Sequence, residues 1–167
     1  MEKVGIFFGT STGNTEAAAE RIASAIGDAE LKNVSEGVSE ADFEAYDNII
    51  LGTSTWGVGD LQDDWDSAIG TLQKANLSGK VVALFGLGDS SSYSDTFVNG
   101  IALLYNAIKD KGATIVGAVD ASDYTYDDSE AVQDGKFIGL ALDEDNESSK
   151  SDIRIEAWVA NLKNSFK

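Results

Sequence analysis

Short apolar runs alternate with amphipathic stretches along most of the chain. Three of the apolar runs are almost continuously apolar, which is typical of parallel strands that helices cover on both faces. The apolar runs predict strands over residues 3–8, 29–34, 48–53, 80–87 and 113–119. The amphipathic stretches predict helices over residues 14–26, 39–45, 63–74, 96–111 and 152–165.

This alternation of strands and helices predicts an α/β fold, a doubly wound five-stranded parallel sheet with helices on both faces. The helical period is clear in residues 14–26, where Ala18, Ile22 and Ala25 fall on one stripe. A chain of 167 residues is long enough for one substantial core and short for two. We therefore expect residues 1–167 to form a single domain.

Residues 120–147 interrupt the alternation with ten acidic residues and one lysine. The segment ends in a sixth apolar run, at residues 136–142, before the last predicted helix. A connection of about 20 residues with little regular pattern is unusual inside a compact domain and usually marks an insertion. We interpret residues 120–135 as an inserted loop that splits the last strand. A solvated acidic loop without function and a docking role are both open.

The charge of the chain limits its partners, because 29 acidic and 12 basic residues give a formal net charge of -17. Such a charge repels phosphates and argues against a nucleic-acid partner. It favours a partner with a basic surface, although acidity that serves solubility alone is the alternative.

The N-terminus lacks a signal-peptide pattern and no apolar run approaches the roughly 20 residues of a membrane span. We expect a cytoplasmic protein with no membrane partner.

Two residue types that carry much of protein chemistry are absent, cysteine and histidine. The lack of cysteine excludes disulfides, thiolate metal sites and cysteine nucleophiles. The lack of histidine excludes a Ser-His-Asp triad and removes the usual general base near neutral pH. Redox chemistry in this chain therefore requires a bound cofactor.

The tetrapeptide GTST occurs twice, at residues 9–12 and 52–55, each time after an apolar run. These runs are the first and third predicted strands, which are neighbours in one common order of doubly wound sheets. Ligands of such sheets bind beyond the carboxyl ends of the strands, where the strand order reverses. The two copies therefore predict one binding site at that edge.

The first copy continues as TSTGNT over residues 10–15 and opens the first predicted helix. Four hydroxyls, one glycine and the free amides at the positive end of a helix dipole make a suitable cradle for a phosphate dianion. No lysine follows the glycine, so the segment is not the phosphate loop of nucleotide hydrolases. The alternative is a Ser/Thr cap on an ordinary helix.

The second copy leads into Trp56, Gly57, Val58, Gly59 and Asp60. Because Trp56 lies between a hydroxyl cluster and two glycines, we expect it on a loop, where an aromatic side chain stacks on planar ligands. A plain loop residue is the alternative. The fourth strand ends in GLGDSSSYSD, which places a carboxylate and a second aromatic ring on a neighbouring loop. Two such rings can enclose a third between them.

These segments together resemble one protein family. IFFGTSTGNTE, TSTWGVGDLQDDW, GLGDSSSYSDTF and GKFIGLALDEDN, with RIEAW near the C-terminus, are similar to the long-chain flavodoxins. Members of this family are small electron carriers that bind one flavin mononucleotide (FMN). The resemblance covers essentially the whole chain, including the insertion that separates long-chain from short-chain members. It implies the strand order 2-1-3-4-5 and a monomer that carries single electrons at low potential between redox partner proteins.

The resemblance also implies which residues bind FMN, and it implies neither a catalytic residue nor a metal. Residues 10–15 hold the phosphate with neutral donors, and Trp56 and Tyr93 flank the flavin ring. Backbone groups of residues 57–59 and 87–89 meet the polar edge of the ring. The expected cofactor-binding residues are Thr10, Ser11, Thr12, Gly13, Asn14, Thr15, Thr53, Ser54, Thr55, Trp56, Gly57, Val58, Gly59, Leu87, Gly88, Asp89 and Tyr93.

The sequence departs from the commoner family pattern at Asn14, where many long-chain members carry lysine, and at residues 90–92.

Two other functions share the fold. An FMN-dependent quinone reductase is an enzyme rather than a carrier and is the first alternative. A receiver-type signalling domain is the remote alternative. A receiver needs paired acids, a phosphoacceptor and a lysine at the ends of particular strands, and this sequence has none of them at those positions.

Acidic residues near the expected flavin edge are candidates for docking a basic-faced reductase and an acceptor enzyme. A surface of this kind steers a partner of opposite charge, and the effect weakens with salt. The candidates are Asp60, Asp63, Asp64, Asp66, Asp123, Asp127 and Asp128.

Overall fold

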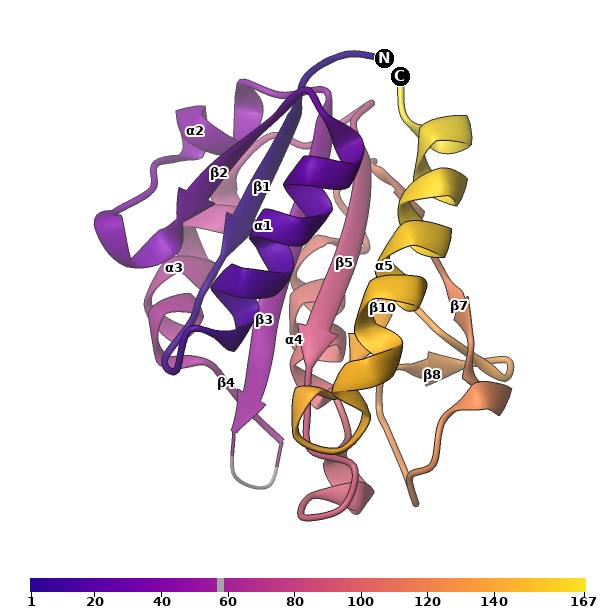
Figure 1. Cartoon of the computed structure of the whole chain (residues 1–167). Coiled ribbons are helices and arrows are strands. Elements are labelled where there is room, and N and C mark those ends of the chain that lie inside the picture. The colour runs from indigo at the N-terminus through magenta and orange to yellow at the C-terminus, as the bar shows by residue number, and fades with distance from the viewer. Residues whose placement is uncertain (57–58) are drawn as a thin grey trace.

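The computed structural model describes residues 1–56 and 59–167 as three layers, a parallel sheet between two layers of helices (Figure 1). Among the described residues, the main sheet has the order β10-β5-β3-β1-β2, with β6 pairing with β5 and β4 pairing antiparallel with β3. Its strands are β1 (Val4–Phe8), β2 (Ala29–Asn33), β3 (Asn48–Trp56), β4 (Asp60–Leu61), β5 (Val81–Leu87), β6 (Thr114–Val116) and β10 (Leu140–Leu142). In order along the sheet, the parallel strands follow the predicted 2-1-3-4-5 arrangement.

The helices lie where the amphipathic pattern predicts them, with shifted ends. They are α1 (Asn14–Ile26), α2 (Glu40–Glu44), α3 (Asp63–Lys74), α4 (Asn99–Ile108) and α5 (Glu144–Ser165). The largest difference is α5, which begins eight residues before the predicted start at residue 152. Residue 147 has non-helical dihedral angles, so a kink separates the first turn of α5 from the rest. The acidic first turn therefore lies before the kink, and the apolar stripe that predicts the rest of the helix follows it.

Alternate residues of β1 face opposite sides of the sheet and divide the core in two. Ile6 packs with α1 and α5, whereas Phe7 packs with α2 and α3. Rings of Phe7 and Phe43 lie 4.4 Å apart, and those of Phe43 and Trp65 lie 6.4 Å apart. Burying apolar side chains on both faces explains why the central strands read as continuous apolar runs.

The last strand of the sheet is split, as predicted, because β6 and β10 pair with successive halves of β5. Residues 117–139, between the two halves, contain β7 (Val119–Asp120), β8 (Val132–Gln133) and β9 (Lys136–Phe137). These strands form a small antiparallel sheet in the order β7-β9-β8. The expectation of an irregular loop is therefore wrong for this part of the insertion.

Aromatic packing explains why the insertion is ordered. The Tyr124 and Phe137 rings lie 4.8 Å apart edge to face, and Tyr126 stacks 5.7 Å from Phe97. Arg154 of α5 lies over the Tyr124 ring at 3.9 Å, and burial raises the pKa of Tyr124 to about 12. The insertion thus packs onto the core on the α3 and α4 side of the sheet and is tied to the last helix.

Candidate functional site

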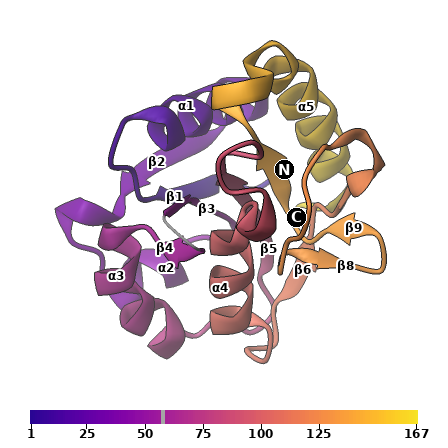
Figure 2. The same cartoon turned by 90° about the horizontal axis from the view of Figure 1, so that it is seen from below.

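The carboxyl ends of β1, β3 and β5 meet at one edge of the sheet, which faces the viewer in Figure 2. A cleft of about 410 Å³ opens there, within the size range of small-ligand sites. Its walls come from both GTST segments, from the loop after β5 and from the start of α5. They are lined by Thr12, Asn14, Ser54, Thr55, Trp56, Leu87, Gly88, Asp89, Tyr93, Glu144 and Asp145.

The first wall is the turn between β1 and α1, where the alternative of a Ser/Thr cap is not found. The N-cap residue is Gly13, with a left-handed φ of 92°, and no side chain caps the helix there. The hydroxyl of Thr10 instead accepts a hydrogen bond from the Gly13 amide at 2.9 Å. The first-turn amides of α1 thus lack a side-chain acceptor, and such amides favour an anion. This geometry favours the phosphate interpretation over the simple cap.

A buried glutamine holds this turn from behind. Gln62 is 1% exposed, and its Nε2 donates to Ser11 Oγ at 3.1 Å. Its Oε1 accepts from the backbone amides of Asp64 and Trp65, which start α3. A Cβ at Gly9 would overlap Gln62 Oε1, so the glycine of the first GTST copy makes room for this side chain. Sequence analysis missed Gln62 because the contact joins residues 51 positions apart.

The second wall is the end of β3, which continues through the second GTST copy to Trp56. Thr55 and Trp56 pair antiparallel with β4 and therefore belong to the strand, a correction to the predicted loop. Thr55 Oγ1 accepts from the Gly100 amide at 2.8 Å, which ties β3 to α4. The Oγ of Ser54 is buried and has no hydrogen-bond partner among the described residues. An unpartnered hydroxyl in a cleft fits a polar ligand that supplies the missing bond.

Two exposed aromatic side chains belong to the lining of the cleft. Trp56 is 40% exposed and Tyr93 is 46% exposed, although both are large and largely apolar. Both line the same cleft. Exposed rings from a strand end and a nearby loop can stack on the two faces of a planar ligand. The structure thus brings together the two rings that the sequence predicts as a pair.

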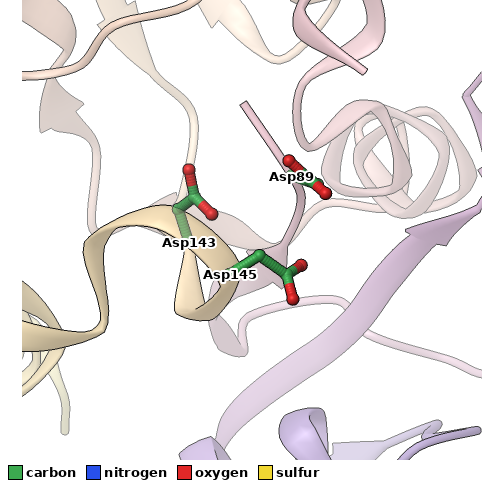
Figure 3. Close-up of side chains that lie close together, drawn as sticks. All are labelled: Asp89, Asp143 and Asp145. Carbon is green, nitrogen blue, oxygen red and sulfur yellow. The ribbon is translucent and has the colours of Figure 1, made fainter. Parts of the chain in front are cut away.

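The third wall is acidic and includes residues that sequence analysis missed. Carboxylate oxygens of Asp89, Asp143 and Asp145 lie within 4.8 Å of one another (Figure 3). Asp143 is buried, caps α5 by accepting from the Asn146 amide, and also accepts from the Ser90 amide at 3.2 Å. The Asn146 side chain donates to Asp89 at 2.8 Å. The start of α5 is thereby bonded to the loop after β5.

The two solvent-accessible carboxyls of this wall differ in their pKa. Hydrogen bonds from the Ser92 amide, the Asn146 side chain and other donors hold the pKa of Asp89 below its ordinary value of 3.8. Partial burial, followed by the like charges of Asp89, Asp143 and Glu144, raises the pKa of Asp145. Of these two carboxyls, Asp89 is therefore the one held ionised, and Asp145 takes up a proton more readily.

The predicted residues do not all line the cleft. Thr10, Ser11, Gly13, Thr15 and Thr53 are not among its lining residues, and the last two are buried at 1% and 0% exposure. Gly59 lines a different cavity, between α3 and α4. Gly57 and Val58, which were also predicted to bind the cofactor, lie outside the described residues.

A cavity of about 530 Å³, larger than the cleft, lies between α1 and α5. It is lined by Ala17, Glu20, Arg21, Ser24, Ala25, Asp152, Ile155 and Glu156. Arg21 there is paired with Glu144 at 3.3 Å and Asp152 at 3.5 Å. All described residues of its lining lie on α1 or α5, and none of them is aromatic. We therefore place the candidate site at the smaller cleft.

The predicted docking carboxylates are not equally available. Asp123 pairs with Arg154 at 3.5 Å and with Lys150 at 3.9 Å, and Asp127 accepts from the Ser94 hydroxyl. The side chain of Asp64 accepts from Gln62 at 2.9 Å. Asp60, Asp63, Asp66 and Asp128 are exposed, and no salt bridge engages them among the described residues. Three of these carboxylates therefore lie in β4 and the first turn of α3, whereas Asp128 lies in the insertion and accepts from the Ser129 amide.

Comparison with known proteins gives one consistent family. A family model described as Flavodoxin matches residues 6–158. The chain is 45% identical over 166 residues to a flavodoxin of Helicobacter pylori and 42% identical over 171 residues to flavodoxin 1 of Azotobacter vinelandii, covering 99% of this chain and at least 98% of each relative. The crystal structure of Fusobacterium nucleatum flavodoxin bound to flavin mononucleotide is 35% identical, with a TM-score of 0.95 over 100% of both chains.

Proposed function

Because the chain belongs to the flavodoxin family, we propose that it is a carrier of single electrons whose redox centre is one non-covalently bound FMN in the strand-end cleft. When bound, FMN supplies the redox chemistry, so no side chain has to act as a catalytic acid or base. The tasks of the protein are to bind the flavin, orient it and set its electrostatic surroundings. The observation that carries the proposal is the union, in one cleft, of a helix start without a side-chain cap and two exposed aromatic rings.

The phosphate of FMN is assigned to the turn of residues 10–15. Support comes from the amides that start α1, which no side chain caps, and from the hydroxyls of the turn. The turn contains no lysine or arginine, so neutral donors carry the whole interaction. Asn14 occupies the cleft wall where many long-chain members carry lysine.

The flavin ring is assigned to the space between Trp56 and Tyr93. Both rings are exposed enough to accept a planar partner, and stacking on an aromatic ring contributes about 1–3 kcal/mol in comparable systems. The unpartnered Ser54 hydroxyl at the cleft gives the ligand one further polar contact. The ionised Asp89 and its neighbours face the remaining edge.

Negative charge near the cleft makes reduction of a bound flavin to its anionic form unfavourable, so the protein is a low-potential carrier. The exposed carboxylates Asp60, Asp63, Asp66 and Asp128 form a surface for a basic-faced reductase and an acceptor enzyme. We expect the protein to work as a monomer. The described residues contain no helix long and apolar enough to cross a membrane, and the cytoplasmic location stays a prediction from the sequence.

The proposal is tested by asking whether the FMN-loaded protein needs partners. It should carry electrons from a basic-faced, NADPH-dependent flavoprotein reductase to cytochrome c, and the rate should fall as salt rises. Omitting either the reductase or the FMN-loaded protein should abolish electron transfer to cytochrome c. Direct, steady reduction of a quinone by a reduced nicotinamide, without any reductase, would favour the quinone reductase alternative.

A further inference from the structure

We propose that Gln62 is a positioning residue for phosphate recognition, acting through the hydroxyl of Ser11. The inference rests on the proposed FMN function and adds to it a residue that does not line the cleft. Gln62 is 1% exposed, whereas Ser11 is exposed at the turn that precedes α1. A buried amide thus holds an exposed hydroxyl from behind.

The orientation of the Gln62 amide is fixed by its four hydrogen bonds. Oε1 accepts from the backbone amides of Asp64 at 3.0 Å and Trp65 at 3.2 Å. Nε2 donates to Asp64 Oδ2 at 2.9 Å and to Ser11 Oγ at 3.1 Å. In a flipped amide, Oε1 would face the Asp64 carboxylate, and Nε2 would face the two backbone amides, which are also donors. Only one orientation therefore satisfies all four partners.

This orientation determines what the Ser11 hydroxyl can do. A serine hydroxyl has one proton to donate, and Nε2 of an amide cannot accept it. Since Ser11 Oγ accepts from Gln62, its proton is free to point away from the protein interior. The result is a neutral donor with a fixed direction, which costs little reorganisation when it meets an anion. Thr10 is arranged in the same way, because its Oγ1 accepts from the Gly13 amide.

Gln62 therefore has two roles: it caps the start of α3, and it positions the Ser11 hydroxyl in the phosphate turn. Its role in positioning is separable from its role in stability, because riboflavin has the flavin ring but no phosphate. A residue that acts on the phosphate turn changes the affinity for FMN and leaves that for riboflavin unchanged. A residue that only supports the fold changes both.

The experiment measures dissociation constants of FMN and riboflavin for the apoprotein by quenching of flavin fluorescence. We expect Ser11→Ala to weaken FMN binding about tenfold, as for a lost hydrogen bond to a charged group, and to leave riboflavin binding unchanged. Gln62→Met should have the same effect. The double variant should also lose about tenfold rather than about a hundredfold, because the two residues act as one unit.

The matched control is Gln73→Met, the same substitution at an exposed position near the other end of α3, which should change neither constant. If Gln62→Met does not fold, Gln62→Glu keeps the oxygen that caps α3 and replaces only the donor. The negative charge that this substitution adds affects FMN binding whether or not the Ser11 hydroxyl is present. The coupling between Gln62→Glu and Ser11→Ala in FMN affinity therefore still isolates the effect of residue 62 on the hydroxyl.

Three results would overturn the inference: no change in FMN affinity, an equal loss for FMN and riboflavin, or a double variant whose losses multiply. In each of these cases the parent protein still binds FMN and the proposed function stands. If the parent protein binds neither flavin, the proposed function fails, and the inference fails with it.

Discussion

The two GTST segments have the same four residues and fold differently. The first, at residues 9–12, leaves the sheet after β1, and its hydroxyls at 11 and 12 are exposed. The second, at residues 52–55, stays within β3, where it pairs with β5 through Ser54 and with β4 at Thr55. The first segment and the helix start that follows it can therefore offer both amides and hydroxyls to a ligand. The second is a strand whose backbone pairs with β5 and β4, so it offers chiefly its side chains.

The glycines of the two copies show why the neighbours, not the tetrapeptide, decide the outcome. A Cβ at Gly52 would overlap the ring of Phe85, which is fully buried. A Cβ at Gly9 would overlap the end of the Gln62 side chain. The first glycine thus makes room for Gln62 and for the buried Trp65 ring at the start of α3, and the second makes room for the Phe85 ring of a neighbouring strand.

The largest expected effect follows from replacing the second glycine. Gly52→Ala should lower the free energy of unfolding of the apoprotein by about 3 kcal/mol, because the buried Phe85 ring has no space to move into. Urea unfolding measures this loss. Gly70→Ala on α3 is the control, since a Cβ there meets nothing within 4 Å and should stabilise the helix by about 0.5–1 kcal/mol.

The same change in the first copy sharpens the comparison. Gly9→Ala should cost less stability, about 1–2 kcal/mol, and should also weaken FMN binding, because it displaces Gln62 from Ser11. Equal unfolding midpoints for Gly9→Ala and Gly52→Ala would contradict the distinction between a sheet glycine and a turn glycine.

The next effect concerns the residue that follows the second copy. Trp56→Ala should weaken FMN binding by about 2 kcal/mol, or about 30-fold, through lost stacking. The stability of the apoprotein should change by less than about 0.5 kcal/mol, since Trp56 is 40% exposed. Leu31→Ala in β2 removes a side chain of the same 40% exposure away from the cleft and should leave FMN binding unchanged. Unaltered affinity in Trp56→Ala would remove the ring from the site.

A smaller effect of opposite sign is expected for Ser54→Ala. Removing a buried hydroxyl without a partner should stabilise the apoprotein by about 1 kcal/mol and weaken FMN binding. Ser151→Ala is a close control, because its hydroxyl is also buried and unpartnered among the described residues but lies on α5. It should stabilise the protein equally and leave FMN binding unchanged. If Ser54→Ala left FMN binding unchanged as well, the hydroxyl would not belong to the site.

The smallest expected effect is a pH dependence of the stability, which comes from Asp145 in the acidic wall of the cleft. The pKa of Asp145 is raised in the folded protein, so its ionisation opposes folding, and the stability it contributes at low pH is lost as the pH rises through the folded pKa. Asp145→Asn should therefore stabilise the protein at neutral pH, by a few tenths of a kcal/mol because solvent screens the exposed group. The gain should vanish below the ordinary pKa of 3.8. A gain that persisted at lower pH would point to a cause other than charge.

The fold and much of the cleft could be predicted from the sequence, because apolar runs and amphipathic stretches are local signals. The central strands and α1 lie where the pattern predicts them, and so do the two rings at Trp56 and Tyr93. The small sheet of the insertion was missed although its signal is local. Asp134 and Gly135 both have positive φ in the turn between β8 and β9, and Asp-Gly between two strands is typical of such hairpins.

Other features depend on contacts that no local pattern reveals. The extension of β3 to Trp56 depends on pairing with β4, and the role of Gln62 depends on Ser11, far away in the chain. The early start of α5 was missed because its first turn has no apolar stripe. Asp143 as an N-cap residue was the available signal, and with it Glu144 and Asp145 would have joined the predicted site.

The central claim is that this cleft holds FMN for transfer of single electrons, and one measurement tests it most directly. The visible absorption spectrum of the FMN-loaded protein should be recorded during stepwise anaerobic reduction. The account predicts flavin bands that change in two separate one-electron steps, the second at low potential. A protein that fails to bind added FMN, or one that takes up two electrons in a single step, would contradict it.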